Sequence, residues 1–187
     1  MDANGDPRVV LVHDWLTGMR GGEKCLEVLC RRWPDAPLFT LLHRAGSVAP
    51  SIEDRRPWTS FLQYLPRVER YYRYLLPLMP MAVESWRLPR CDLVVSLSHC
   101  VAKAVRPPHG TPHVCYCFTP MRYAWHMRDA YLAGRVRGLK ARAVERFLGL
   151  LRDWDRRTAA RVTHFVAISQ TVRRRSGAGR ARGCRPR

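Results

Sequence analysis

Gly21-Gly22 is the first of three segments whose residue types could do chemistry. The pair follows a short apolar run and precedes an amphipathic pattern that begins at Glu23. The amino terminus of a helix offers unpaired N–H groups and a partial positive charge, and glycines let a diphosphate come close. The dinucleotide-binding pattern GxGxxG is absent, and a Gly-Gly pair before a helix is often only a turn. Gly21 and Gly22 are therefore candidate diphosphate ligands, with a structural turn as the alternative.

The second segment, Ser96-Leu97-Ser98-His99, closes an apolar run that is typical of a buried strand. Ligands of open parallel sheets bind outside the carboxyl ends of the strands. His99 is therefore a candidate catalytic residue that would contact acceptor or donor hydroxyls, and a hydrogen-bonded structural histidine is the alternative. Lys103 lies four residues later, where it would share a helix face with His99 and could bind the diphosphate of a donor.

The third segment runs from Tyr116 to Trp125 and combines a strand end with aromatic and guanidinium side chains. Such side chains stack on sugars and form paired hydrogen bonds to phosphates or carboxylates. Core packing is the alternative, but an arginine between Met121 and Tyr123 would be unusual there. Arg122, Tyr123 and Trp125 are therefore candidates for binding an acceptor.

These segments need a scaffold, and the sequence predicts an α/β fold with a Rossmann-like parallel sheet flanked by helices. Short apolar runs alternate with helical periodicities, which is the pattern of parallel strands joined by crossover helices. One helix is expected from Glu23 until Pro34 ends it, and a longer one carries an apolar stripe at Leu139, Ala143, Phe147, Leu150, Leu151 and Trp154. The expected strands are 9–13, 38–42, 58–61, 92–97, 113–117 and 164–168.

The composition divides the chain into three parts. Residues 1–7 are polar and are expected to be flexible, and residues 8–169 have the apolar content of one folded domain. Residues 170–187 consist mainly of Arg, Gly, Ala, Pro and Ser, which cannot bury enough apolar surface to fold. We expect this stretch to be a disordered basic tail, either a polyanion-binding segment or a frameshifted end.

The net charge of +18 favours polyanionic partners, which include nucleic acids, anionic lipids and nucleotide diphosphates. Seven arginines fall within residues 173–187, so the tail carries much of the excess. No helix-turn-helix, zinc-finger or RNP motif is present, so no specific nucleic-acid partner is expected. Nonspecific binding to nucleic acid or to an anionic membrane stays open as an alternative function.

Residues 61–90 mix aromatic and aliphatic side chains with five arginines. This combination suits an anionic lipid interface, and ordinary helix packing with exposed arginines is the alternative. The chain opens without a signal-peptide pattern and has no apolar run long enough to span a bilayer. The expected location is cytoplasmic, either soluble or peripheral on the inner face of the membrane.

The seven cysteines are odd in number, and no two of them are separated by two residues. Disulfide frameworks and zinc sites use paired spacings that are missing here. We therefore expect reduced, mostly buried thiols and no metal site.

Three longer motifs resemble, in order, those of family 4 glycosyltransferases with the GT-B fold. They are VLVHDWLTGMRGGEKCLEVLC, SLSHCVAKAV and HVCYCFTPMRYAW, and the resemblance covers about Arg8 to Ser169. It implies the amino-terminal, acceptor-side domain of a two-domain enzyme. Gly21 and Gly22 match the family's glycine-rich loop next to the donor diphosphate. Many relatives carry a histidine where this chain has Phe118, whose side chain cannot donate a hydrogen bond, so the resemblance leaves open whether that position has a polar role.

The resemblance also implies a reaction. The substrates would be a nucleotide-sugar and a glycan or lipid-linked acceptor, with hexosyl transfer, retention of configuration, no cofactor and no obligatory metal. The family's E-x7-E pattern lies in its carboxyl-terminal donor domain and has no counterpart in this sequence, where Glu145 and Asp153 are eight apart on the wrong domain. We therefore expect the chain alone to be inactive and to lack a donor-binding half. A noncatalytic remnant is the alternative.

Overall fold

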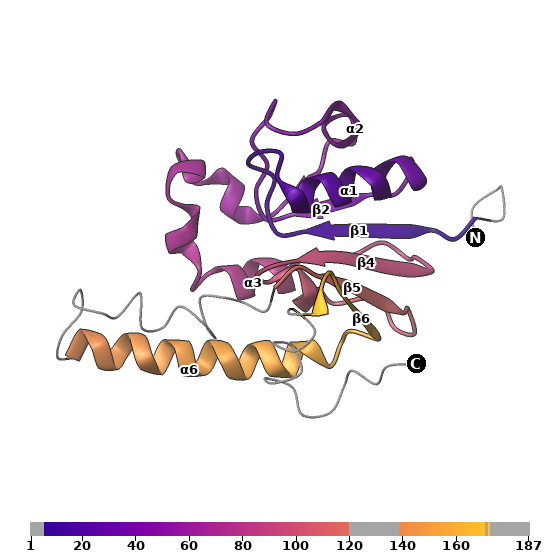
Figure 1. Cartoon of the computed structure of the whole chain (residues 1–187). Coiled ribbons are helices and arrows are strands. Elements are labelled where there is room, and N and C mark those ends of the chain that lie inside the picture. The colour runs from indigo at the N-terminus through magenta and orange to yellow at the C-terminus, as the bar shows by residue number, and fades with distance from the viewer. Residues whose placement is uncertain (1–5, 120–138, 171, 173–187) are drawn as a thin grey trace.

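The sheet at the centre of the molecule has six strands, and every neighbouring pair is parallel. The computed structural model describes residues 6–119, 139–170 and 172 (Figure 1). The strand order is β3-β2-β1-β4-β5-β6. The strands are β1 (Val9–His13), β2 (Leu38–Thr40), β3 (Trp58–Thr59), β4 (Leu93–Ser98), β5 (His113–Cys117) and β6 (His164–Ala167). The predicted α/β, Rossmann-like class is confirmed.

Helices cover both faces of this sheet, as parallel strands require. Figure 1 shows α1 and α2 on one side and α3 and α6 on the other. The α-helices are α1 (Gly21–Arg32), α2 (Pro50–Glu53), α3 (Met79–Glu84) and α6 (Leu139–Ala159). The 3-10 turns are η1 (Phe61–Tyr64), η2 (Val68–Arg70), η3 (Tyr72–Leu75) and η4 (Ala102–Ala104).

Strand β1 explains why two separate cores form. Side chains alternate between the faces of a strand, so Val9 and Leu11 pack with α1 and α2, whereas Val10 and Val12 pack with the η1–α3 segment and α6. All five residues of β1 are buried, as the apolar run predicts.

The ends of several elements differ from the sequence-based expectation. Strand β2 stops at Thr40, and β3 stops at Thr59 because η1 begins at Phe61. Helix α1 already includes Gly21 and Gly22, whereas the apolar periodicity indicated a start at Glu23. Glycine has no side chain with which to show periodicity, so the pattern could not reveal the first turn.

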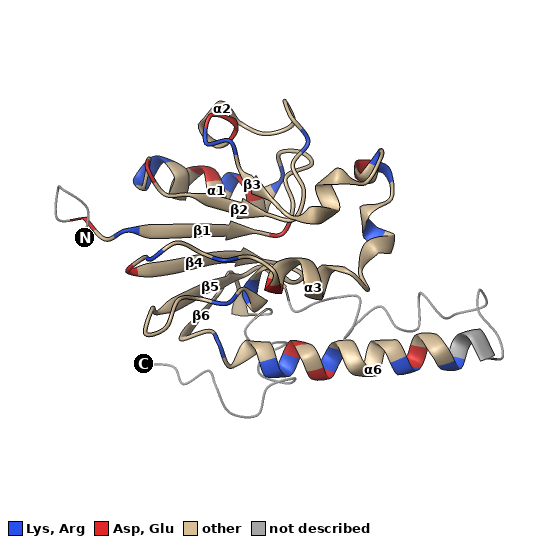
Figure 2. Ribbon diagram, turned by 180° about the vertical axis from the view of Figure 1, so that it is seen from behind, with Lys and Arg blue, Asp and Glu red and all other residues tan. Residues whose placement is uncertain are grey.

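Helix α6 is longer than its apolar stripe, and two members of the stripe, Ala143 and Leu150, were assigned to the wrong face because both are exposed. Leu150 is 61% exposed, and Leu148 is buried in its place. The side of α6 that faces the sheet also buries Asp155 and Thr158. Figure 2 shows that basic and acidic residues recur along α6. Polar contacts therefore fix the rotation of α6 together with apolar ones.

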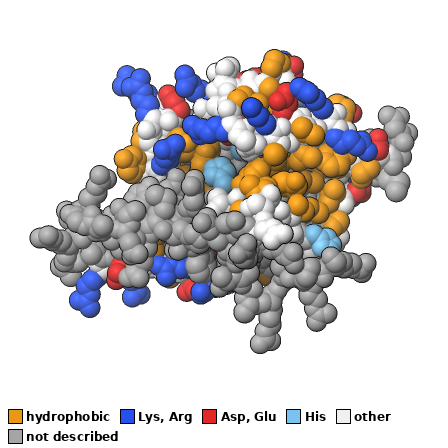
Figure 3. Space-filling model, viewed as in Figure 1, with side chains coloured by type: hydrophobic (Ala, Val, Ile, Leu, Met, Phe, Trp, Pro, Cys, Tyr) orange, Lys and Arg blue, Asp and Glu red, His pale blue; other side chains and the backbone are white. Residues whose placement is uncertain are grey.

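One face of the sheet beside α1 is only partly covered by the described residues. Val166 and the following Ile168 are 38% and 48% exposed, and Tyr116 beside Val166 is half-buried. Figure 3 shows apolar side chains gathered on this side of the molecule. Among the described helices, none is both long enough and apolar enough to cross a membrane.

Candidate functional site

The candidate site lies where the strand order reverses. Strand β1 pairs with β2 on one side and with β4 on the other, so the segments that leave β1 and β4 diverge at their carboxyl ends. In doubly wound sheets the ligand crevice forms at this switch point. The residues that follow the two strands are His13-Asp14-Trp15 and Ser98-His99-Cys100.

The carboxylate of Asp14 joins the two halves of the sheet at this point. One oxygen accepts the backbone N–H groups of His99 (2.6 Å) and Cys100 (2.9 Å). The other accepts those of Val101 and Ala102, both at 2.7 Å. Four successive amides therefore surround a side chain that is fully buried. Such a nest of N–H groups binds anions, and here the anion is supplied by the chain itself.

The same carboxylate orients the imidazole of His99. Its Oδ2 lies 3.0 Å from His99 Nδ1, and the His99 side chain keeps 26% of its surface exposed. Burial by itself would raise the pKa of Asp14, but His99 and the backbone N–H donors outweigh it, so the pKa lies below the ordinary value. An ionised Asp14 fixes the proton on Nδ1 and leaves Nε2 of His99 as the atom for a ligand.

His13 provides a second, fully buried imidazole beside this pair. Its Nδ1 lies 3.1 Å from the carbonyl oxygen of Trp15. Burial lowers the pKa of His13, and the neighbouring His99 lowers it further. The ring is therefore neutral and donates Nδ1–H to Trp15, which makes Nε2 a hydrogen-bond acceptor, and none of the described residues bonds to that atom.

The start of α1 lies against His13 and Phe118. A Cβ atom added to Gly22 would be 3.3 Å from the Phe118 ring and 3.4 Å from His13 Nε2, whereas one added to Gly21 would meet nothing within 4 Å. Glu23 caps the helix, because its carboxylate accepts the N–H of Arg20 at 3.0 Å. The glycine pair thus lies at a helix amino terminus, and Gly22 is also closely packed. Close packing is therefore a structural reason for a glycine at position 22, whether or not a diphosphate binds there.

The two glycines should respond differently to alanine. Gly22→Ala is expected to destabilise the fold by about 1–3 kcal/mol, because the added Cβ lies 3.3 Å from the Phe118 ring, which must shift against its neighbours. Gly21→Ala is the matched control and should stay within about 0.5 kcal/mol of the parent, since its site is open. Urea denaturation of the two variants measures the difference. Equal stabilities would show that α1 does not pack at Gly22 as described.

Lys103 lies in the interior, away from His99. The predicted shared helix face does not form, because residues 102–104 make only a 3-10 turn. The Lys103 side chain is 3% exposed, and its ammonium forms an ion pair with Asp155 of α6 and donates a hydrogen bond to the carbonyl oxygen of Cys100. This geometry gives Lys103 a structural role. Its assignment as a diphosphate ligand stays a prediction. To bind a diphosphate, Lys103 would have to leave Asp155.

His113 is a further buried imidazole, and it lies one strand away on β5. Its Nε2 is 2.8 Å from the hydroxyl of Ser96. Burial lowers the pKa of His113 to about 4. The group is therefore held neutral in the folded state at neutral pH.

This neutral state makes stability depend on pH. The unfolded chain binds a proton on His113 near its ordinary pKa of 6.5 and the folded chain only near 4, so stability is lost as pH falls through this window. The loss for one such group is about 3 kcal/mol. Asp14 does not contribute in this pH window. Its pKa is lowered in the folded state, so its effect on stability appears only at pH values below the ordinary pKa of a carboxyl group. We expect His113→Gln to reduce the pH dependence of unfolding, with a remainder from His13, whose pKa burial also lowers, and exposed His109→Gln to leave it unchanged. An unchanged slope in His113→Gln would contradict the expectation.

The predicted acceptor-binding residues Arg122, Tyr123 and Trp125 lie outside the described residues. Within the described part of the chain, no group of His, Cys, Asp and Glu could hold a metal ion. Five of the six described cysteines are buried, and Cys25 is half-buried.

A cavity of about 370 Å³ lies at the opposite edge of the sheet, beside the start of β1 and the end of α1. Arg8, which lines it, is paired with Asp92 at 3.1 Å, and Arg32 is 3.9 Å from Asp6. Two of its three arginines are therefore near carboxylates. The convergent polar groups lie at the carboxyl edge instead.

Asp14 and His13 are the site residues that the sequence reasoning missed. Their signal was a histidine and an aspartate directly at the end of the first buried strand, the position at which ligands of such sheets bind. Asp155 was missed because it lies far along the chain, on a helix interpreted as amphipathic.

No family model, curated protein or solved structure matches the chain.

Proposed function

We propose that this chain is the acceptor-side, amino-terminal half of a family 4 glycosyltransferase. The complete enzyme would transfer a hexosyl group from a nucleotide-sugar to a hydroxyl of a glycan or a lipid-linked acceptor. Three motifs that resemble the family support the proposal. The single observation that carries it is the Asp14–His99 pair at the switch point of the sheet, where His99 presents a partly exposed imidazole.

The roles follow from the geometry of the described residues. The N–H groups at the start of α1 would hold the diphosphate near Gly21 and Gly22 and stabilise its charge as it leaves. His99, held by Asp14, would direct Nε2 toward a hydroxyl of acceptor or donor. His13 is neutral and its Nε2 is buried against the start of α1, so it would position that helix end and not contact a ligand itself. No step in this scheme needs a metal.

A nucleotide-binding experiment tests the location of the site. Uridine diphosphate glucose and guanosine diphosphate mannose, each added at millimolar concentration, should shift the ¹H–¹⁵N signals of Gly21, Gly22 and His99. Strand β6 lies away from the switch point and should not respond. His99→Gln should reduce the shifts, and His109→Gln, an exposed histidine elsewhere, should not. Shifts confined to other regions, or none with either sugar nucleotide, would reject the proposal.

Turnover is a separate question. The donor-holding pattern E-x7-E does not occur in the 187 residues, so we expect no release of nucleoside diphosphate when the purified chain is mixed with a sugar nucleotide and an acceptor. Measurable turnover would refute the assignment of this chain as the acceptor-side half alone.

A further inference from the structure

We propose that the outer side of residues 56–81 is a docking surface for an anionic lipid bilayer. This segment follows α2 and runs from β3 through η1, η2 and η3 to α3. The inference requires only the described fold, and it stands whether or not the chain belongs to a transferase.

The segment has an inner side that holds it to the sheet. Leu62, Val68, Tyr72 and Met79 are buried in the core on this face. Successive 3-10 turns keep the backbone close to that core, and the Tyr71 hydroxyl donates to the carbonyl oxygen of Pro66 at 3.0 Å. The outer side chains are therefore presented by a fixed backbone.

The outer side carries large apolar groups that the protein leaves in water. Tyr64 and Tyr74 are 85% and 82% exposed, and Trp58 and Met81 are 65% and 58% exposed. Phe61 and Leu78 add smaller exposed areas. Single exposed apolar residues are common, but six within one segment are typical of an interaction surface.

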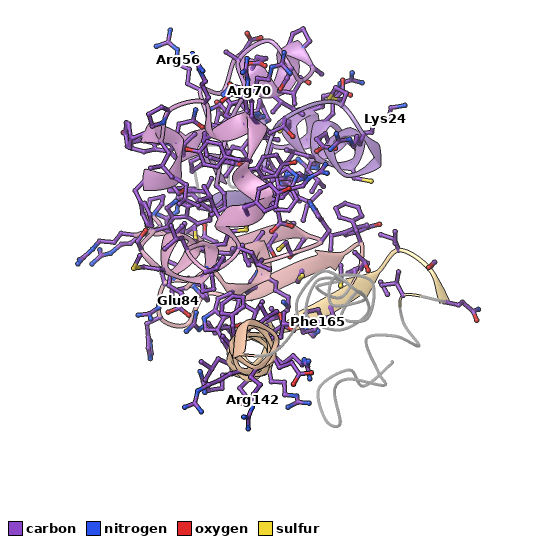
Figure 4. All side chains as sticks on the ribbon, turned by 90° about the vertical axis from the view of Figure 1, so that its left-hand side faces the viewer. Lys24, Arg56, Arg70, Glu84, Arg142 and Phe165 are labelled. Carbon is purple, nitrogen blue, oxygen red and sulfur yellow. The ribbon has the colours of Figure 1, made fainter. Side chains whose placement is uncertain are left out.

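Arginines without carboxylate partners lie among these groups. Arg56, Arg67 and Arg70 form no ion pair among the described residues, whereas Arg8, Arg106 and Arg161 elsewhere are paired with acids. Arg56 and Arg67 are also the two described non-glycine residues with positive φ, at 48° and 52°. Figure 4 shows Arg56 and Arg70 on the same side of the molecule, away from Arg142 of α6. Glu69 is the single acid in residues 56–81.

This chemistry fits a bilayer better than a nucleic acid. Tyrosine and tryptophan partition to the level of the lipid headgroups, arginines reach anionic headgroups, and Leu78 and Met81 can enter the acyl region. Aliphatic side chains add nothing to base stacking. The surface is also close to the candidate site. The ring centroids of buried Tyr72 and Trp15 are 5.1 Å apart, and those of Trp15 and His99 are 4.4 Å apart. A docked bilayer would thus lie near the switch point.

Vesicle co-sedimentation of the full chain tests this inference. Vesicles of phosphatidylcholine mixed with phosphatidylglycerol should bind the protein, and phosphatidylcholine alone should bind it weakly. Tyr64→Ser/Tyr74→Ser should weaken binding about tenfold through lost apolar insertion. Arg67→Gln/Arg70→Gln should weaken it about tenfold and reduce its salt dependence. Both variants should keep the unfolding midpoint of the parent, because the altered side chains are exposed.

The matched control is Val28→Ser/Leu150→Ser, which removes two exposed apolar side chains, 63% and 61% exposed, from α1 and α6. This variant should bind like the parent. All variants keep the arginines of residues 173–187, so these arginines do not account for differences in vesicle binding between the variants. Equal binding by the parent and the Tyr64/Tyr74 variant would overturn the inference. The inference would also be overturned if the parent bound single-stranded DNA more tightly than vesicles and the same substitutions weakened the binding of DNA.

Discussion

Replacing Asp14 with alanine is expected to lower the free energy of unfolding by about 3–5 kcal/mol, a large fraction of the stability of a typical domain. The carboxylate is fully buried and accepts four backbone N–H groups at 2.6–2.9 Å. Alanine leaves all four donors without a partner in the interior. Each buried unsatisfied donor costs about 1–3 kcal/mol, partly recovered by relaxation or entering water.

Urea denaturation measures the change, and amide hydrogen exchange shows where it occurs. Exchange at His99, Cys100, Val101 and Ala102 should accelerate more than exchange in the centre of β1. Asp153→Ala is the control, because Asp153 is exposed and its pair with Arg156 lies at the surface of α6. It should stay within about 0.5 kcal/mol of the parent.

Asp14→Asn separates charge from shape. The amide keeps one acceptor oxygen but directs an NH₂ group at donors, so we expect an intermediate loss of stability. If Asp14→Ala and Asp153→Ala were equally stable, Asp14 could not be the buried anion that links β1 to the turn after β4. The orientation of His99 would then need another cause.

The second large effect concerns the buried pair of Lys103 and Asp155. Lys103→Met alone should destabilise the protein by about 3–5 kcal/mol, because it leaves a carboxylate in the interior without its ammonium partner. Asp155→Leu alone should have a similar effect for the opposite charge. Lys103→Met/Asp155→Leu should recover most of the loss, since two apolar side chains need no partner. Thermal or urea unfolding of the four proteins gives the coupling energy of the pair.

The double variant also tests the diphosphate role predicted for Lys103. If the pair is structural, the double variant keeps the nucleotide-induced shifts of Gly21 and Gly22. If Lys103 leaves Asp155 to bind the diphosphate, those shifts disappear while stability is preserved. Independent, additive losses from the two single substitutions would show instead that Lys103 and Asp155 do not interact.

The sheet was largely predictable because its information is local. Fully buried parallel strands such as β1 and β4 are continuous apolar runs, and the long connections between them require crossovers. The candidate location at the carboxyl ends follows from the same class of fold. Strand ends were less predictable: β3 ends at Thr59 because residues 61–64 form a 3-10 turn that docks Leu62 in the core. That contact is between residues distant in sequence.

The sequence by itself determined the fold class, the positions of the strands and a set of candidate polar residues at their carboxyl ends. Only the tertiary structure decided how those residues are paired. Asp14 and His99 are 85 positions apart, and Lys103 and Asp155 are 52 apart. The pattern of residue types carries hydrophobicity and turn preference, which act over a few positions. Whether a given lysine faces a ligand or a buried carboxylate depends on how the strands and α6 pack, and that is fixed only when the whole chain has folded.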